Sequence, residues 1–201
     1  KGSAELVINS YSKSFFSEKQ NTNIRIASAR AGNVIGGGDW AENRIVPDCI
    51  KAWTQSKKVK IKSPNSTRPF QHVLEPLSGY ISLAKQLTKN KYLNSHSFNF
   101  GPLSNSNKKV IDLVEELGKK WSNASWEIDS ANNDYVEAKL LKLNCDKALS
   151  LLHWEPTLNF KKTMEITGDW YFNFYNNSNS KVYDMCCDQI KLFMENQKEV
   201  L

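Results

Sequence analysis

Three polar side chains stand beside turns in the sequence, and their chemical types suit the binding of a sugar diphosphate. Asn33 follows a short apolar strand, and Arg44 and Arg68 occupy turn or helix-start positions. An amide both donates and accepts hydrogen bonds, which suits sugar hydroxyls. A guanidinium offers a planar fork of donors that matches a phosphate. The alternatives are a turn cap for Asn33 and a surface ion pair for each arginine.

A glycine-rich run lies between Asn33 and Arg44. The segment GGGDWA, residues 36–41, satisfies the G-x-G-x-x-G/A pattern of dinucleotide-binding turns. That pattern also requires an acidic residue about 20 positions later, after the next strand. The strand expected at 59–62 is followed by Ser63, Pro64 and Asn65 instead, and Asp39 would set its charge against a pyrophosphate. We therefore interpret the run as a loop that shapes a substrate pocket, or as glycines that only permit a positive φ.

The hydrophobic pattern predicts the elements that position these residues. Apolar residues at three- and four-residue spacing indicate helices, and short apolar runs bounded by turn residues indicate strands. Their alternation favours an α/β chain, and the helix-rich end favours a small additional lobe. We expect helices over 1–16, 45–55, 75–87, 110–121, 145–152, 160–175 and 181–197, and extended segments over 24–29, 59–62, 70–74, 97–100, 126–128 and 140–143.

Composition excludes several classes of protein. The 201 residues are 40% hydrophobic and 24% charged, which is typical of a globular chain. The net charge of +6 comes from 23 lysines spread along the chain, a pattern that predicts a solvated surface and no nucleic-acid partner. No apolar run approaches the ~20 residues of a membrane span, and no signal-peptide pattern is present. We expect a cytoplasmic protein without a membrane partner, a metal site or disulfides, since the four cysteines lack zinc-site spacing.

Five motifs, in this order and spacing, resemble those of the CDP-glucose 4,6-dehydratases, which are extended short-chain dehydrogenase/reductases: RAGNVIGGGDWAENRIVPDCI, RPFQHVLEPLSGYISLA, FNFGP, EAKLLKLNCDKA and TGDWY. The resemblance implies the carboxyl-terminal part of a Rossmann-type parallel sheet plus a small α+β substrate-binding lobe. Residues 1–30 and about 69–100 would lie on the Rossmann side. Residues of about 31–68 and 101–201 would form the lobe.

The same resemblance implies an NAD-dependent lyase of deoxysugar biosynthesis, such as that of lipopolysaccharide O-antigen. Its reaction oxidises CDP-glucose at C4, removes water across C5 and C6, and returns hydride to C6, giving CDP-4-keto-6-deoxyglucose. It also implies a homodimer. The alternatives are a nucleotide-sugar epimerase, another extended short-chain dehydrogenase, or a non-enzymatic nucleotide-binding or interaction module.

The resemblance also assigns roles to residues of this chain. Asn33 and Arg68 match residues that contact the sugar diphosphate in relatives, and Arg44 matches a basic residue just before the start of the following helix. Glu137 and Lys142 match a segment that closes over the nucleotide. Val136 replaces the histidine that relatives often carry there, which puts that closure in doubt.

Lys1 matches the lysine of the Tyr-x-x-x-Lys motif, a catalytic and cofactor-binding residue that lowers the phenol pKa and holds the ribose of NAD. NAD would then be bound mainly by residues upstream of Lys1, so we expect the chain alone to lack dehydratase activity. His72 is expected to be structural, and the bulky Trp154, Trp170 and Tyr171 are expected in the core.

Overall fold

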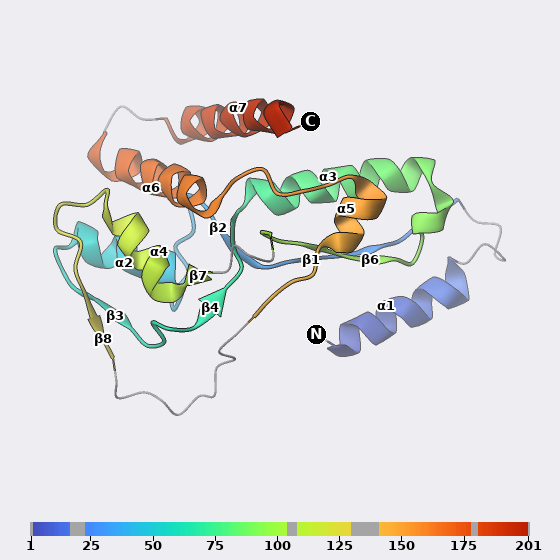
Figure 1. Cartoon of the computed structure of the whole chain (residues 1–201), viewed down its shortest axis with the longest axis horizontal. Coiled ribbons are helices and arrows are strands. Elements are labelled where there is room, and N and C mark those ends of the chain that lie inside the picture. The colour runs from blue at the N-terminus through green and yellow to red at the C-terminus, as the bar shows by residue number, and fades with distance from the viewer. Residues whose placement is uncertain (1, 17–22, 104–107, 130–140, 178–180, 201) are drawn as a thin grey trace.

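A computed structural model describes residues 2–16, 23–103, 108–129, 141–177 and 181–200 of the chain. Helices and short, mostly parallel strand pairs make up the fold, so the predicted α/β class is confirmed (Figure 1). Its helices are α1 (Gly2–Phe15), α2 (Ile45–Thr54), α3 (Leu74–Lys89), the 3-10 helix η2 (Lys91–Leu93), α4 (Val110–Gly118), α5 (Asp146–Leu152), α6 (Phe160–Asn176) and α7 (Val182–Val200).

The strands pair across long stretches of sequence. Three pairs are parallel: β1 (Ser28–Ala31) with β6 (Ser97–Phe100), β2 (Asn33–Ile35) with β5 (Phe70–His72), and β3 (Val59–Ile61) with β8 (Trp126–Ile128). One pair is antiparallel, β4 (Thr67–Arg68) with β7 (Lys108–Lys109).

The helices match the predicted helices closely, whereas three short strands were not predicted. β2 directly precedes the glycine-rich run of residues 36–41, and β4 lies within an expected loop. The extended segment expected at 140–143 forms no strand over 141–143, and residue 140 lies outside the described residues.

Two hydrophobic cores account for most of the buried apolar side chains in the described ranges. The larger joins α2, α4 and α6 with β3 and contains the fully buried Trp53, Leu113 and Tyr171. The smaller joins α3, α5 and β6 around Phe98, Phe100 and Trp154. Figure 1 shows the two groups of elements side by side, with β2 between them and β1 alongside β6 in the smaller group. Trp154, Trp170 and Tyr171 are buried, as predicted.

Helix α6 turns an apolar stripe toward the larger core. Met164, Trp170 and Tyr171 are buried and recur at helical spacing on one side of the helix. Asn159 caps its first turn, because the Asn159 side chain accepts a hydrogen bond from the Lys162 N–H at 2.9 Å. The cap and the stripe fix where α6 begins and which side faces the glycine-rich loop.

A buried carboxylate ties α3 to the segment that leads into α6. Glu75, in the first turn of α3, is 1% exposed. Its carboxylate accepts hydrogen bonds from the backbone N–H of Thr157, at 3.0 and 3.1 Å, and of Leu158, at 2.6 Å. Burial raises the pKa of Glu75 to about 7, against the lowering effect of these N–H donors. This contact joins two parts of the fold that are about 80 residues apart in sequence.

Candidate functional site

A cavity of about 470 Å³ brings the three sequence-predicted polar residues together. It lies where β2 and β4 meet the beginning of α2. Its lining consists of Gly32, Asn33, Val34, Ile35, Gly36, Asp39, Asn43, Arg44, Ile45, Val46, Pro47, Arg68, Phe70 and Val110. Asn33, Arg44 and Arg68 therefore share one concave surface, although 35 positions separate the first from the last.

Arg68 is buried at the wall of this cavity. It is 8% exposed, and its Nη1 donates to the Thr67 carbonyl at 2.8 Å. The antiparallel pairing of β4 with β7 sets Arg68 opposite Lys108 and fixes its backbone. Burial distinguishes Arg68 from a cation on the solvated surface. A buried cation acts on a nearby anion through less water, so its attraction is stronger than at the surface.

Arg44 lies at the rim of the cavity and is exposed. It is the residue before α2, and its Nη1 donates to Oδ2 of Asp39 at 3.0 Å. The Arg44 side chain is 63% exposed, and that of Asp39 is 28% exposed. Exposed pairs of this kind are worth only about 0–1 kcal/mol. The ion pair anticipated as an alternative is therefore present, and it uses one guanidinium nitrogen, which leaves other N–H donors of Arg44 for an anionic ligand.

Asn33 lies in the floor of the cavity. It is the first residue of β2 and is half-buried opposite Phe70 of β5, which also contributes to the lining. The first turn of α2 contributes Ile45, Val46 and Pro47, so the positive end of that helix also faces this space. Pro47 is accommodated there because first-turn N–H groups lack partners within the helix.

The charges around the cavity favour an anion. Among the described residues, two guanidinium groups line it against one carboxylate, that of Asp39. Sequence reasoning missed Asn43, which lines the same cavity with a φ of 60°. The signal that could have found it is the residue type, because asparagine is one of the few residues that adopts this left-handed conformation readily.

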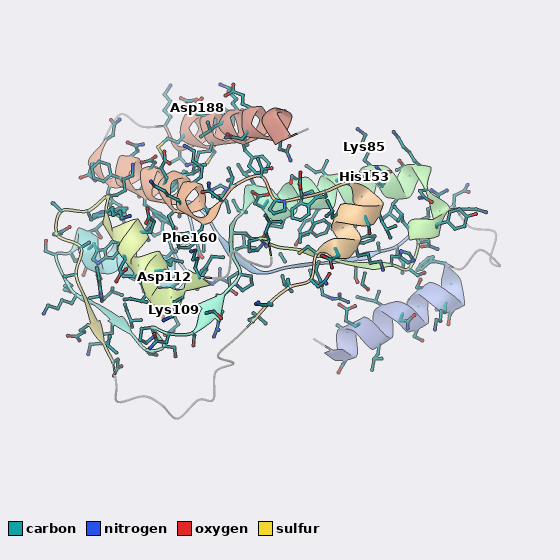
Figure 2. The ribbon with its side chains drawn as sticks, in the orientation of Figure 1. Lys85, Lys109, Asp112, His153, Phe160 and Asp188 are labelled. Carbon is teal, nitrogen blue, oxygen red and sulfur yellow. The ribbon has the colours of Figure 1, made fainter. Side chains whose placement is uncertain are left out.

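Three cavities in the described ranges are larger. That of about 530 Å³ is lined by Asn23, Arg25, Ala84, Leu87 and Thr88, with one guanidinium group. The other two are less suited to a diphosphate. One, of about 580 Å³, lies beside α4 and the start of α6, near Lys109, Asp112 and Phe160 in Figure 2. Its lining mixes carboxylates with lysines: Lys108, Asp112, Glu115, Glu116, Lys119 and Lys161. The other, of about 650 Å³, lies between α3 and α7 and is lined mainly by apolar side chains.

The glycine-rich loop is closed on one side by an aromatic ring. A Cβ atom on Gly37 would lie 2.0 Å from Cδ2 of Trp170 in α6. The ring therefore occupies the space beside the glycine backbone, which a pyrophosphate would need in a dinucleotide cradle. This packing supports the interpretation of the loop as a pocket-shaping element.

Replacing Gly37 by alanine is expected to destabilise the chain by about 1 to 3 kcal/mol, because the added methyl group overlaps the Trp170 ring. Thermal unfolding should show a melting temperature roughly 2 to 12 °C lower. The matched control is Gly38→Ala, whose Cβ has its nearest neighbour at 3.6 Å and carries only the strain of a φ of +79°. Equal melting temperatures for Gly37→Ala and the parent chain would show that Trp170 is not packed there.

The remaining candidate residues lie elsewhere. Lys1 and Glu137 fall outside the described residues. Lys142 is exposed before α5 and is absent from the cavity lining, so its role stays a prediction. His72 is 1% exposed, and its Nδ1 accepts from the Leu74 N–H at 3.3 Å. Burial lowers the pKa of His72 to about 4, so its imidazole is neutral near pH 7, in keeping with a structural role.

Neither a membrane span nor a metal centre is found in the part of the chain that the structure describes. Each helix there is too short or too polar to cross a bilayer. No three His, Cys, Asp or Glu side chains in the described ranges are grouped so as to hold a metal ion.

Comparison with known proteins agrees with the resemblance inferred from the motifs. The chain is 41% identical over 174 residues to CDP-glucose 4,6-dehydratase of Salmonella typhimurium, an alignment that covers 85% of this chain and 48% of that protein. The predicted resemblance to the CDP-glucose 4,6-dehydratases is confirmed. A more distant relative, UDP-glucose 4-epimerase of Mycoplasma pneumoniae, is 23% identical over 156 residues, covering 74% of this chain and 45% of the epimerase. The chain thus spans about half the length of the curated relatives it matches.

Solved structures show the same fold. UDP-glucuronic acid 4-epimerase of Bacillus cereus, in complex with UDP-glucuronic acid and NAD, gives a TM-score of 0.70 at 22% identity over 87% of this chain and 52% of that one. dTDP-glucose 4,6-dehydratase of Bacillus anthracis, in complex with NAD, gives 0.66 at 18% identity over 88% of this chain and 51% of that one. The chain therefore has the fold of the carboxyl-terminal part of these Rossmann-type proteins. No family model matches the sequence.

Proposed function

We propose that this chain forms the substrate-binding part of an NAD-dependent nucleotide-sugar 4,6-dehydratase, a lyase that converts CDP-glucose to CDP-4-keto-6-deoxyglucose. The observation that carries the proposal is the convergence of Asn33, Arg44 and Arg68 on one cavity. The 41% identity to a CDP-glucose 4,6-dehydratase supports CDP-glucose as the substrate.

The arrangement of the cavity suggests how the substrate binds. Arg68, held by burial, pairs with one phosphate of the diphosphate, and Arg44 at the rim pairs with the other. The N-terminal end of α2 adds a favourable potential for the same anion. Asn33 on the floor donates to and accepts from sugar hydroxyls.

The proposed cofactor, NAD, is assigned mainly to residues outside the described part of the chain. The glycine-rich loop does not fit its pyrophosphate, because Trp170 fills the space beside Gly37. We accordingly assign substrate binding to the described residues and a cofactor contact to Lys1. Glu137 and Lys142 are proposed to close over the nucleotide. On the resemblance alone, we also propose a cytoplasmic homodimer. Residues 1–30 and about 69–100 would lie on the Rossmann side, and the rest would lie in the substrate-binding lobe.

Calorimetric titration of the chain with CDP-glucose and, separately, with a DNA duplex tests this proposal. Submillimolar binding of CDP-glucose without binding of DNA is expected, because the cavity combines two guanidinium groups with an amide, whereas the lysines are dispersed. Binding of DNA without binding of CDP-glucose would overturn it. We also expect no turnover of CDP-glucose by the chain alone.

A nucleotide-sugar epimerase is the second candidate. Its support is the structural likeness to UDP-glucuronic acid 4-epimerase, which at 22% identity reflects the shared fold. Parallel titrations with CDP-glucose and UDP-glucose separate the two candidates. Tighter binding of the cytidine compound supports the dehydratase, and tighter binding of the uridine compound supports the epimerase.

A further inference from the structure

We propose that Tyr171 of α6 is a positioning residue, which holds Arg44 at the cavity by fixing Asp39 in the glycine-rich loop. This inference rests on the proposed function, since it concerns how Arg44 is presented to a diphosphate. Its basis is a series of contacts in which Asp39 links Tyr171 of α6 to Arg44 beside the cavity.

The first contact in this series is a double hydrogen bond. The Tyr171 hydroxyl donates to the Asp39 carbonyl at 2.8 Å and accepts from the Asp39 N–H at 3.0 Å. One side chain thus satisfies both backbone groups of Asp39 and restricts its φ and ψ. Tyr171 is fully buried, which raises its pKa to about 12. The hydroxyl therefore keeps its proton near pH 7 and remains a donor.

The second contact runs through the Asp39 carboxylate. Oδ1 accepts from the Ala41 N–H at 3.0 Å, and Oδ2 accepts from Nη1 of Arg44 at 3.0 Å. The turn at Ala41 sets the direction of the carboxylate, and the carboxylate in turn holds the guanidinium. Arg44 carries further N–H donors in its planar fork, so it can reach a phosphate while Asp39 retains one of them.

Aromatic packing seats the whole loop on α6. The Trp40 ring lies 5.3 Å from Tyr171, 5.4 Å from Phe174 and 5.8 Å from Tyr175, measured between ring centroids. Gly37 lies against Trp170 on the same helix. The loop therefore has a fixed platform, and the Tyr171 hydroxyl adds a directional anchor to it.

This arrangement lowers the ordering cost of ligand binding. An arginine that is 63% exposed would otherwise sample many rotamers, and a phosphate would have to select one of them. An Arg44 already directed by Asp39 needs less ordering when the ligand arrives. The function of Tyr171 is thus indirect, since it contacts Asp39 and not the cavity.

The test uses Tyr171→Phe, which keeps the buried ring and removes the hydroxyl. The dissociation constant for CDP-glucose is expected to rise roughly 3- to 10-fold. The matched control is Tyr175→Phe, which removes a hydroxyl from the same aromatic platform and is expected to leave the affinity unchanged. Unaltered CDP-glucose affinity in a folded Tyr171→Phe chain would overturn the proposal.

A double-mutant cycle distinguishes positioning from general stability. In an Arg44→Ala background, Tyr171→Phe is expected to have no further effect on CDP-glucose affinity, because the guanidinium that Tyr171 positions is already absent. An equal loss in both backgrounds would show a structural role unrelated to Arg44. If Tyr171→Phe fails to fold, Asp39→Asn is compared in the parent and Arg44→Ala backgrounds instead. It tests the link between Asp39 and Arg44, and its effects on CDP-glucose affinity are interpreted in the same way.

Amide hydrogen exchange tests the anchor without any ligand. In the free chain, Tyr171→Phe is expected to speed exchange of the backbone amides of residues 37–43 relative to Tyr175→Phe. Equal exchange in the two variants would overturn the anchor itself. If the parent chain fails to bind CDP-glucose, the proposed function fails, whereas the exchange result still decides whether Tyr171 fixes the loop.

Discussion

Replacing Arg68 by alanine is expected to weaken the binding of CDP-glucose by ~1.5 to 3 kcal/mol, which corresponds to roughly a 10- to 150-fold higher dissociation constant. The reason is that Arg68 is a buried cation at the cavity wall, where its attraction for a phosphate is less screened by water. Calorimetric titration of the parent and variant chains measures the difference.

Two further variants make the Arg68 experiment specific. Arg68→Lys retains the charge and loses the forked donor, so its affinity should fall between those of the parent and Arg68→Ala. Lys191→Ala removes an exposed cation from α7, far along the chain from the cavity-lining residues, and should leave the affinity unchanged. A folded Arg68→Ala chain that binds CDP-glucose as tightly as the parent would remove Arg68 from the binding site.

The Glu75 contribution to stability is expected to fall as the pH rises from about 4.5 to 7, because Glu75 titrates at different pH values in the folded and unfolded chains. The ordinary pKa of glutamate is 4.5, and burial raises that of Glu75 to about 7 in the folded chain. Between these values the folded chain keeps the proton that the unfolded chain has released. The Glu75 contribution to the free energy of unfolding therefore decreases across this window by roughly 3 kcal/mol, whereas the lowered pKa of His72 acts in the opposite direction.

Urea unfolding of the parent chain and of Glu75→Gln at pH 5, 6 and 7 measures this contribution. The glutamine keeps a carbonyl acceptor for the Thr157 and Leu158 N–H groups but does not titrate, so the stability of the parent should fall relative to that of Glu75→Gln as the pH rises. The control is Glu155→Gln at an exposed position near the same segment, which should retain the slope of the parent. Identical slopes in the parent and Glu75→Gln would show that Glu75 titrates normally.

The helices were predictable from the sequence because each carries a long amphipathic pattern. α3 and α6 bury one side each, and their spacing of apolar residues is visible without a structure. The strands β2, β4 and β7 were missed because two or three residues are too few to show a period, and each lies beside glycine or polar turn residues that predict a loop. Their pairing depends on partners tens of residues away in the sequence.

The candidate site was predictable in its residue types but not in its geometry. Asn33, Arg44 and Arg68 were selected because an amide and guanidinium groups near turns suit a sugar diphosphate. The burial of Arg68 depends on β4 pairing with β7, about 40 residues later, and local sequence does not encode that contact. Tyr171 was predicted as a core residue from its size. Its hydrogen bonds to Asp39 span 132 positions, so only the structure could reveal them.

The most direct test of the proposed function is a crystal structure of the chain grown with CDP-glucose. The account predicts that the diphosphate lies in the cavity of about 470 Å³, with phosphate oxygens within roughly 3 Å of guanidinium nitrogens of Arg44 and Arg68. It also predicts that the side chain of Asn33 contacts the ligand. A diphosphate bound outside this cavity, or bound in it without contact to Arg68, would contradict the account.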